Sequence, residues 1–158
     1  MDTIKAAAAA FLANKRIAVT GVSRTAKGHG GNAVYNRLRT CGYDVFAVNP
    51  NTDQVEGNRS YASLRDIPGG VGAVVIATRP DRAEATMREC VELGIRQVWI
   101  HRSRGERSVC ADARVVGRDN GITVIDGGCP LMFEPTSDFV HKVMRVVLTA
   151  TGSVPKRV

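Results

Sequence analysis

The sequence lacks the features that mark several common classes of protein. Its four cysteines, Cys41, Cys90, Cys110 and Cys129, form no C-x-x-C pair, which argues against a zinc site and against a redox dithiol. They indicate reduced thiols in a cytoplasmic protein. No apolar run approaches the ~20 residues that a membrane-spanning helix needs, so we expect no membrane partner.

Aromatic residues are also scarce, at 5% of the chain, and they do not alternate with a run of basic residues. The 22 basic side chains nevertheless outnumber the 15 acidic ones, and the resulting net charge of +7 attracts anions. A nucleic-acid surface is weakly supported by this pattern. The phosphates of a small ligand account for the charge equally well.

What the sequence does contain is a regular alternation of strand and helix patterns. Short apolar runs predict strands at 16–20, 44–48, 72–77, 96–101 and 122–126. Helices are expected at 3–14, 31–41, 80–93, 106–119 and 137–148, the last capped by Thr136 or Ser137. Residues 49–70 are expected to be irregular apart from a short turn at 62–66, and residues 154–158 to form a frayed tail.

This alternation predicts an α/β fold of the three-layer, Rossmann-like (doubly wound) kind, with a five-stranded, mainly parallel sheet. We expect a single domain over residues 1–158, with its core at about 15–134. Trp99 is expected in the core, and Phe133 and Phe139 are expected to pack beneath the last helix.

The segment from Arg16 to Pro50 indicates a nucleotide-binding βαβ unit. An apolar run ends in Gly21, at the strand-to-helix turn where phosphate usually binds. The later string Gly28-His29-Gly30-Gly31-Asn32-Ala33 fits G-x-G-x-x-A, but it lies too far on to be that turn and reads as the start of a helix. The second strand ends in Asn49-Pro50-Asn51 rather than in the acidic residue that holds the ribose of NAD, which argues against NAD.

Ligands of open parallel sheets bind beyond the carboxyl ends of the strands. Those ends offer small residues, hydroxyl groups and arginines, but no pair of carboxylates. They are Gly21-Val22-Ser23-Arg24, Asn49-Pro50-Asn51-Thr52, Ala77-Thr78-Arg79-Pro80, His101-Arg102-Ser103 and Gly127-Gly128-Cys129-Pro130. This set suits a phosphorylated anion better than hydrolytic acid–base chemistry, and a metal site is not expected.

Several of these motifs together resemble the stand-alone coenzyme A-binding proteins, whose domain is similar to the CoA-binding domain of succinyl-CoA ligase alpha subunits. The resemblance covers roughly residues 15–134. It rests on Val19-Thr20-Gly21-Val22-Ser23, Val48-Asn49-Pro50, Tyr61-Ala62-Ser63-Leu64-Arg65-Asp66-Ile67-Pro68, Ala77-Thr78-Arg79-Pro80 and Gly128-Cys129-Pro130.

The resemblance implies a pocket for CoA or an acyl-CoA. In it, Gly21, Ser23 and Arg24 would hold the pyrophosphate through a backbone N–H, a hydroxyl and a guanidinium, with Val22 beside them. Asn49, Pro50 and Thr52 would flank the adenosine and its 3′-phosphate. The wall against the adenine or pantetheine would be lined by Ala77, Thr78 and Arg79, with His101 and Arg102 at the next strand end.

One departure from the family concerns the 3′-phosphate. The ligase subunits place a lysine near the position of Thr52, and this chain has none there. Arg24, Lys27 or Arg79 would have to meet the phosphate instead.

Two further side chains carry alternative interpretations. His101 reads as a polar strand end rather than as an acid or base, although an ordinary histidine titrates near neutrality. Cys129 reads as structural, and the alternative is a reactive thiol that forms a mixed disulfide with CoA.

We therefore expect CoA binding, sensing or delivery rather than catalysis. The first alternative is an NADP-dependent oxidoreductase or another nucleotide-binding enzyme, and the second is a nucleic-acid-binding module. A homodimer through the apolar last helix is also expected to be feasible.

Overall fold

The computed structural model describes residues 3–25, 30–101, 111–152 and 154–158. Its strands are β1 Arg16–Thr20, β2 Asp44–Val48, β3 Gln54–Val55, β4 Asn58–Tyr61, β5 Ala73–Ile76, β6 Gln97–Ile100 and β7 Thr123–Asp126. Its α-helices are α1 Ile4–Leu12, α2 Gly30–Thr40, α3 Pro80–Glu92, α4 Ala111–Asp119 and α5 Phe139–Ala150, with 3-10 turns η1 Leu64–Asp66 and η2 Pro130–Met132.

The strands form one sheet in the order β3-β4-β2-β1-β5-β6-β7, parallel throughout except for the β3–β4 hairpin. The α/β Rossmann-like prediction is therefore confirmed, but the predicted number of strands is wrong: the described residues form a sheet of seven strands rather than five. Both extra strands lie in the segment 49–70, which we expected to be irregular. β4 pairs in parallel with the end of β2, and the short β3 folds back on β4.

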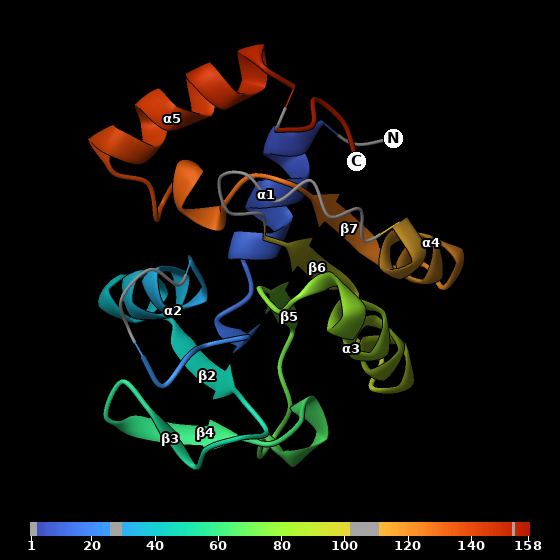
Figure 1. Ribbon diagram of the computed structural model, residues 1–158. Coiled ribbons are helices and arrows are strands. Elements are labelled where there is room, and N and C mark those ends of the chain that lie inside the picture. The colour runs from blue at the N-terminus through green and yellow to red at the C-terminus, as the bar shows by residue number, and fades with distance from the viewer. Residues whose placement is uncertain (1–2, 26–29, 102–110, 153) are drawn as a thin grey trace.

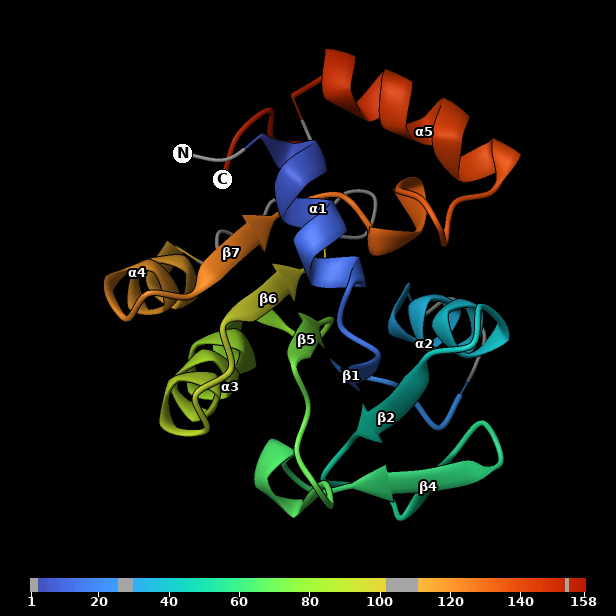
Figure 2. The ribbon, with the colours of Figure 1, turned by 180° about the vertical axis from the view of Figure 1, so that it is seen from behind.

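Helices cover both faces of the sheet (Figures 1 and 2). Strand residues with one parity, such as Val19 and Trp99, pack with α1 and α2 on one face. Residues of the other parity, such as Val74 and Val98, pack with α3 and α4 on the opposite face. Trp99 is fully buried as expected, and its ring meets Phe11 at a centroid distance of 5.4 Å. This alternation of side chains buries each parallel strand on both faces.

The last helix departs from two expectations. Asp138, rather than Thr136 or Ser137, caps α5 by accepting a hydrogen bond from the His141 amide. Phe133 is buried as expected, but Phe139 is 81% exposed.

The last residues do not fray, because they join the amino-terminal segment. Val154 is buried, Arg157 bridges to Thr3, and the Ile4 amide donates to the Lys156 carbonyl at 3.1 Å. None of the helices in the described ranges is long and apolar enough to cross a membrane.

Candidate functional site

The order of the strands reverses between β1 and β5, and backbones approach one another closely at the carboxyl ends of these two strands. From β1 the chain proceeds to β2 on one side, whereas β5 leads to β6 on the other. Gly21 follows β1 with a φ of +76°, and a Cβ atom there would lie 2.5 Å from the Ala77 carbonyl oxygen. A Cβ on Gly31, in α2, would lie 3.0 Å from the Gly21 carbonyl oxygen. These contacts bring three backbones together at the place where doubly wound sheets bind ligands.

The loop after β1 is shaped by two buried or half-buried asparagines. Asn32 accepts a hydrogen bond from the Ser23 amide at 2.8 Å and donates from Nδ2 to the Ser23 carbonyl at 2.9 Å. Asn49 donates from Nδ2 to the Val22 carbonyl at 2.9 Å. These bonds tie Val22 and Ser23 to α2 and to the end of β2.

The same bonds change which amides of the loop can meet an anion. The Gly21 amide, which we expected to hold phosphate, donates to the Val48 carbonyl at 3.2 Å. The Ser23 amide is taken by Asn32. The amides of Val22 and Arg24 donate to no residue in the described part of the chain. Backbone N–H groups are strong donors. Because Val22 is fully buried and Arg24 is exposed, the Arg24 amide is the more accessible anion donor of these two.

Asn32 also ties the loop to the β3–β4 hairpin. It is 2% exposed, and its Nδ2 donates to Glu56 Oε1 at 2.7 Å. Glu56 sits in the hairpin turn with a φ of +48°, a conformation that non-glycine residues rarely adopt. Our sequence reasoning missed both residues. The helical spacing could have indicated that Asn32 is buried, because it lies one turn before Tyr35 on the same buried face of α2.

The residues after β2 form hydrogen bonds within their own segment. The Asn49 side chain accepts from the Asn51 amide at 2.9 Å, and the Thr52 hydroxyl donates to the Gln54 carbonyl at 2.9 Å. Pro50 is exposed. The Thr52 hydroxyl is therefore engaged with β3, while Pro50 leaves an apolar ring surface open to a ligand.

The residues after β5 carry an unsatisfied polar group. The Thr78 hydroxyl oxygen is buried and has no hydrogen-bond partner. Such a group costs roughly 1–3 kcal/mol of stability, and an unpaired group of this kind calls for an explanation, such as a bound water or ligand. Next to it, Arg79 occupies the N-cap position of α3 without a capping hydrogen bond from its side chain. That side chain is 87% exposed, and its Nε lies 3.7 Å from Asp81 Oδ1.

Two titratable side chains near this edge, His101 and Cys129, are held uncharged by burial. Burial lowers the pKa of His101 to about 4, so the imidazole is neutral at pH 7. Burial raises the pKa of Cys129 to about 12, so its thiol is a poor nucleophile. These shifts favour the structural interpretation of Cys129 over a mixed disulfide. Within the described ranges, no three His, Cys, Asp or Glu side chains gather where they could hold a metal ion.

The structure brings Gly21, Val22, Ser23, Asn49 and Ala77 together through these contacts. Arg24 is exposed in the same loop. The His101 amide donates to the Ile76 carbonyl at 2.9 Å, which places His101 beside the end of β5. Arg102 and Lys27 lie outside the described residues.

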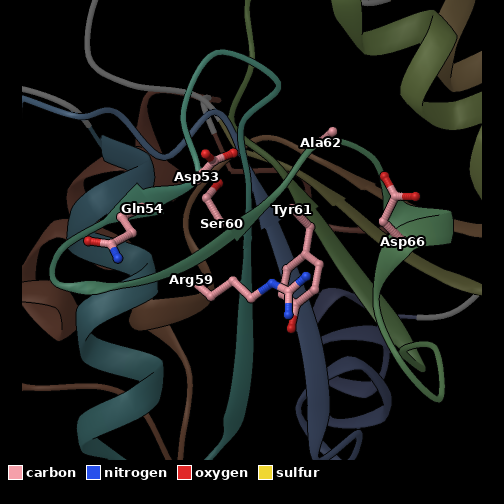
Figure 3. A pocket seen from close by; sticks show the side chains of 7 residues that line it. All are labelled: Asp53, Gln54, Arg59, Ser60, Tyr61, Ala62 and Asp66. Atoms are coloured by element: carbon pink, nitrogen blue, oxygen red, sulfur yellow. The ribbon is translucent and has the colours of Figure 1, made fainter.

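A polar groove of about 670 Å³ lies beside β4, and its lining begins at Asp53, the residue after Thr52 (Figure 3). Its lining includes two carboxylates, Asp53 and Asp66, and the Arg59 guanidinium, which lies 5.1 Å from the centroid of the Tyr61 ring. The mixed charges make this groove less suited to a polyanion than the loop after β1. Sequence reasoning missed it because it depends on the two unexpected strands.

Comparison with known proteins gives a consistent result. Residues 15–135 match the family described as CoA binding domain. The chain is 33% identical over 118 residues to acetate–CoA ligase [ADP-forming] II of Archaeoglobus fulgidus, covering 70% of this chain and 17% of the ligase. It is 28% identical over 120 residues to the uncharacterized protein YneT of Bacillus subtilis, covering 73% of this chain and 82% of YneT.

Solved structures support the fold. A hypothetical protein from Pyrococcus horikoshii OT3 superposes with a TM-score of 0.72 at 24% identity, over 83% of this chain and 92% of that one. The chain spans only about a fifth of the length of the ligase relatives, with 17% and 20% of the two covered.

Proposed function

Because the chain belongs to the CoA-binding domain family, we propose that it binds coenzyme A or an acyl-CoA at the junction of β1 and β5. The buried Thr78 hydroxyl without a partner is the observation that supports this site most strongly. A ligand hydroxyl, amide or phosphate oxygen placed there would satisfy it, and the shaped loop after β1 lies alongside.

In this proposal the pyrophosphate meets the Arg24 amide, the Ser23 hydroxyl and the Arg24 guanidinium. The Ser23 oxygen accepts from the Thr25 amide at 3.1 Å, which leaves its own hydrogen free to donate. Asn49 and Pro50 flank the adenosine, and Ala77 and Thr78 line the other wall. Arg24 and Arg79 take the place of the family's lysine at the 3′-phosphate.

We further propose a binding, sensing or carrier role in the cytoplasm. Cys41, Cys90 and Cys129 are free thiols, which fits a reducing compartment. The neutral His101 and the buried Cys129 serve binding better than proton transfer. The alternatives remain an NADP-dependent oxidoreductase and a nucleic-acid-binding module.

Calorimetric titration of ligand-stripped protein with CoA, dephospho-CoA, NAD and NADP tests the proposal. We expect CoA to bind, and we expect loss of the 3′-phosphate to weaken binding roughly tenfold or more, because charge-assisted hydrogen bonds contribute about 1.5–3 kcal/mol each. A preference for NADP would instead support the oxidoreductase. Steeply salt-dependent binding to any DNA duplex, with no response to the four ligands, would support the nucleic-acid module.

Replacing Thr78 by valine should separate stability from binding. Valine has a similar shape and removes a hydroxyl that has no partner, so we expect the free energy of unfolding to stay the same or rise by about 1 kcal/mol. The CoA affinity should fall roughly tenfold. Urea denaturation and calorimetry measure the two quantities.

Thr86→Val is the matched control. The Thr86 hydroxyl donates to the Arg82 carbonyl at 3.2 Å within α3, so its loss should not change the CoA affinity. Unchanged affinity in Thr78→Val would remove Thr78 from the binding site.

A further inference from the structure

The outer face of α5 exposes a continuous apolar strip. Met144 and Leu148 pack inward against the core. The side chains on the outer face are exposed to unusual extents for their type: Phe139 81%, Val140 62%, Val143 48%, Val146 67% and Val147 51%. Figures 1 and 2 show α5 at the outside of the molecule, so no other described element covers this strip.

Charged side chains of the last helix and of the segment before it pair with one another. Lys142 pairs with Glu134 at 2.6 Å, and His141 Nδ1 lies 2.8 Å from Asp138. The Arg145 guanidinium lies 5.4 Å from the centroid of the Phe133 ring and donates to the Met132 carbonyl. Residues 134–150 therefore carry two acidic and two basic side chains, whereas the whole chain has a net charge of +7.

This charge balance selects among the partners that could cover the strip. An anionic membrane or an acidic protein would be met by a basic rim, which this face lacks. An identical copy brings the same charges to the interface, and repulsion is avoided only where the local charge is near zero. Residues 134–150 satisfy that condition in an otherwise basic protein.

The spacing of the strip also suits a second helix. Val140, Val143, Val147 and Ala150 follow the three-then-four spacing at which two helices pack side by side. Burying an aromatic side chain removes about 150–250 Å² from water, and a valine about 60–120 Å². At the observed exposures, the strip offers roughly 400 Å² per copy. The strips of two facing copies, together with the polar residues around them, would bury a total area close to the ~1,000 Å² of a specific interface.

We propose that the α5 strip is a homodimer interface, in which α5 of one copy packs against α5 of a second copy. The proposal does not depend on CoA binding. It predicts a particle of twice the 17.0 kDa chain mass, and it predicts that salt leaves the dimer intact because apolar contacts hold it.

Sedimentation equilibrium over a range of concentrations, with and without added salt, tests the proposal. We expect the unaltered chain to dimerise, and Val147→Glu to raise the dissociation constant roughly 100-fold by burying unpaired charge. Val115→Glu on α4 is the matched control, since Val115 and Val147 are both 51% exposed. Val146→Glu provides a second variant, and circular dichroism confirms that each variant folds.

Several outcomes would overturn the proposal. A monomer at every concentration would do so, and so would a dimer that survives Val147→Glu and Val146→Glu. Co-sedimentation of the unaltered chain with phosphatidylserine vesicles, lost in Val147→Glu, would assign the strip to a membrane surface instead.

Discussion

Replacing Gly21 by alanine is expected to abolish CoA binding and to lower the free energy of unfolding by about 2–5 kcal/mol. The new Cβ would lie 2.5 Å from the Ala77 carbonyl oxygen and 2.8 Å from the Thr78 amide nitrogen. The β1 and β5 ends would have to separate, and the left-handed backbone at φ +76° adds its own cost for alanine. Urea denaturation and calorimetry measure the two effects.

Gly42→Ala isolates the backbone cost. Gly42 has a φ of +86° and nothing within 4 Å of an added Cβ, so we expect a loss of about 1–2 kcal/mol and no change in CoA affinity. Equal losses of stability in the two variants would show that β1 and β5 yield to the methyl group. In that case the close approach at Gly21 would not shape the site.

Asn32→Asp is expected to have the second-largest effect. Aspartate keeps an acceptor for the Ser23 amide but replaces a donor with a second oxygen. That oxygen would face the Ser23 carbonyl and Glu56 Oε1, which now lie 2.9 and 2.7 Å from Nδ2. We expect the free energy of unfolding to fall by about 3–5 kcal/mol and CoA affinity to fall with it, because the loop loses its fixed shape.

The Asn32→Asp defect should depend on pH with a definite sign. Protonation of a carboxyl at this contact supplies the missing donor, so stability relative to the unaltered chain should improve as the pH falls from 7 to 5. The double variant Asn32→Asp with Glu56→Gln should recover part of the loss at pH 7. Asn36→Asp, exposed on the same helix, should stay within about 0.5 kcal/mol of the unaltered chain. Equal losses at positions 32 and 36 would attribute the effect to helix charge alone.

The buried strands were the most predictable part of the fold. The run Ala73–Ile76, for example, is buried at every position, and the helix that follows it ends just before Gly94, so periodicity alone locates this strand. The hairpin gave no such signal. β3 has only two residues, and β4 reads Asn58-Arg59-Ser60-Tyr61, which is polar at three of four positions. β4 becomes a strand because it pairs with the free edge of β2, and its own sequence pattern does not indicate a strand.

The site was predictable in its strand ends and not in its supporting contacts. Residues such as Gly21 and Thr78 follow strands and can be found by counting along the sequence. Asn32 and Asn49 act across separations of 9 and 27 residues, which no local pattern reveals. Phe139 was misjudged for a related reason, because an amphipathic pattern shows that a helix has an apolar side but does not say which molecule covers it.

The β3–β4 hairpin also bears on how the protein behaves when crowded. Without it, the five residues of β2 would form an open sheet edge with unpaired amides and carbonyls, the template on which edge-to-edge aggregation starts. The hairpin covers the carboxyl end of that edge, at Ala47 and Val48, and ends the sheet in a strand of two residues. A segment whose sequence does not resemble a strand therefore shortens the part of the β2 edge that another chain could pair with.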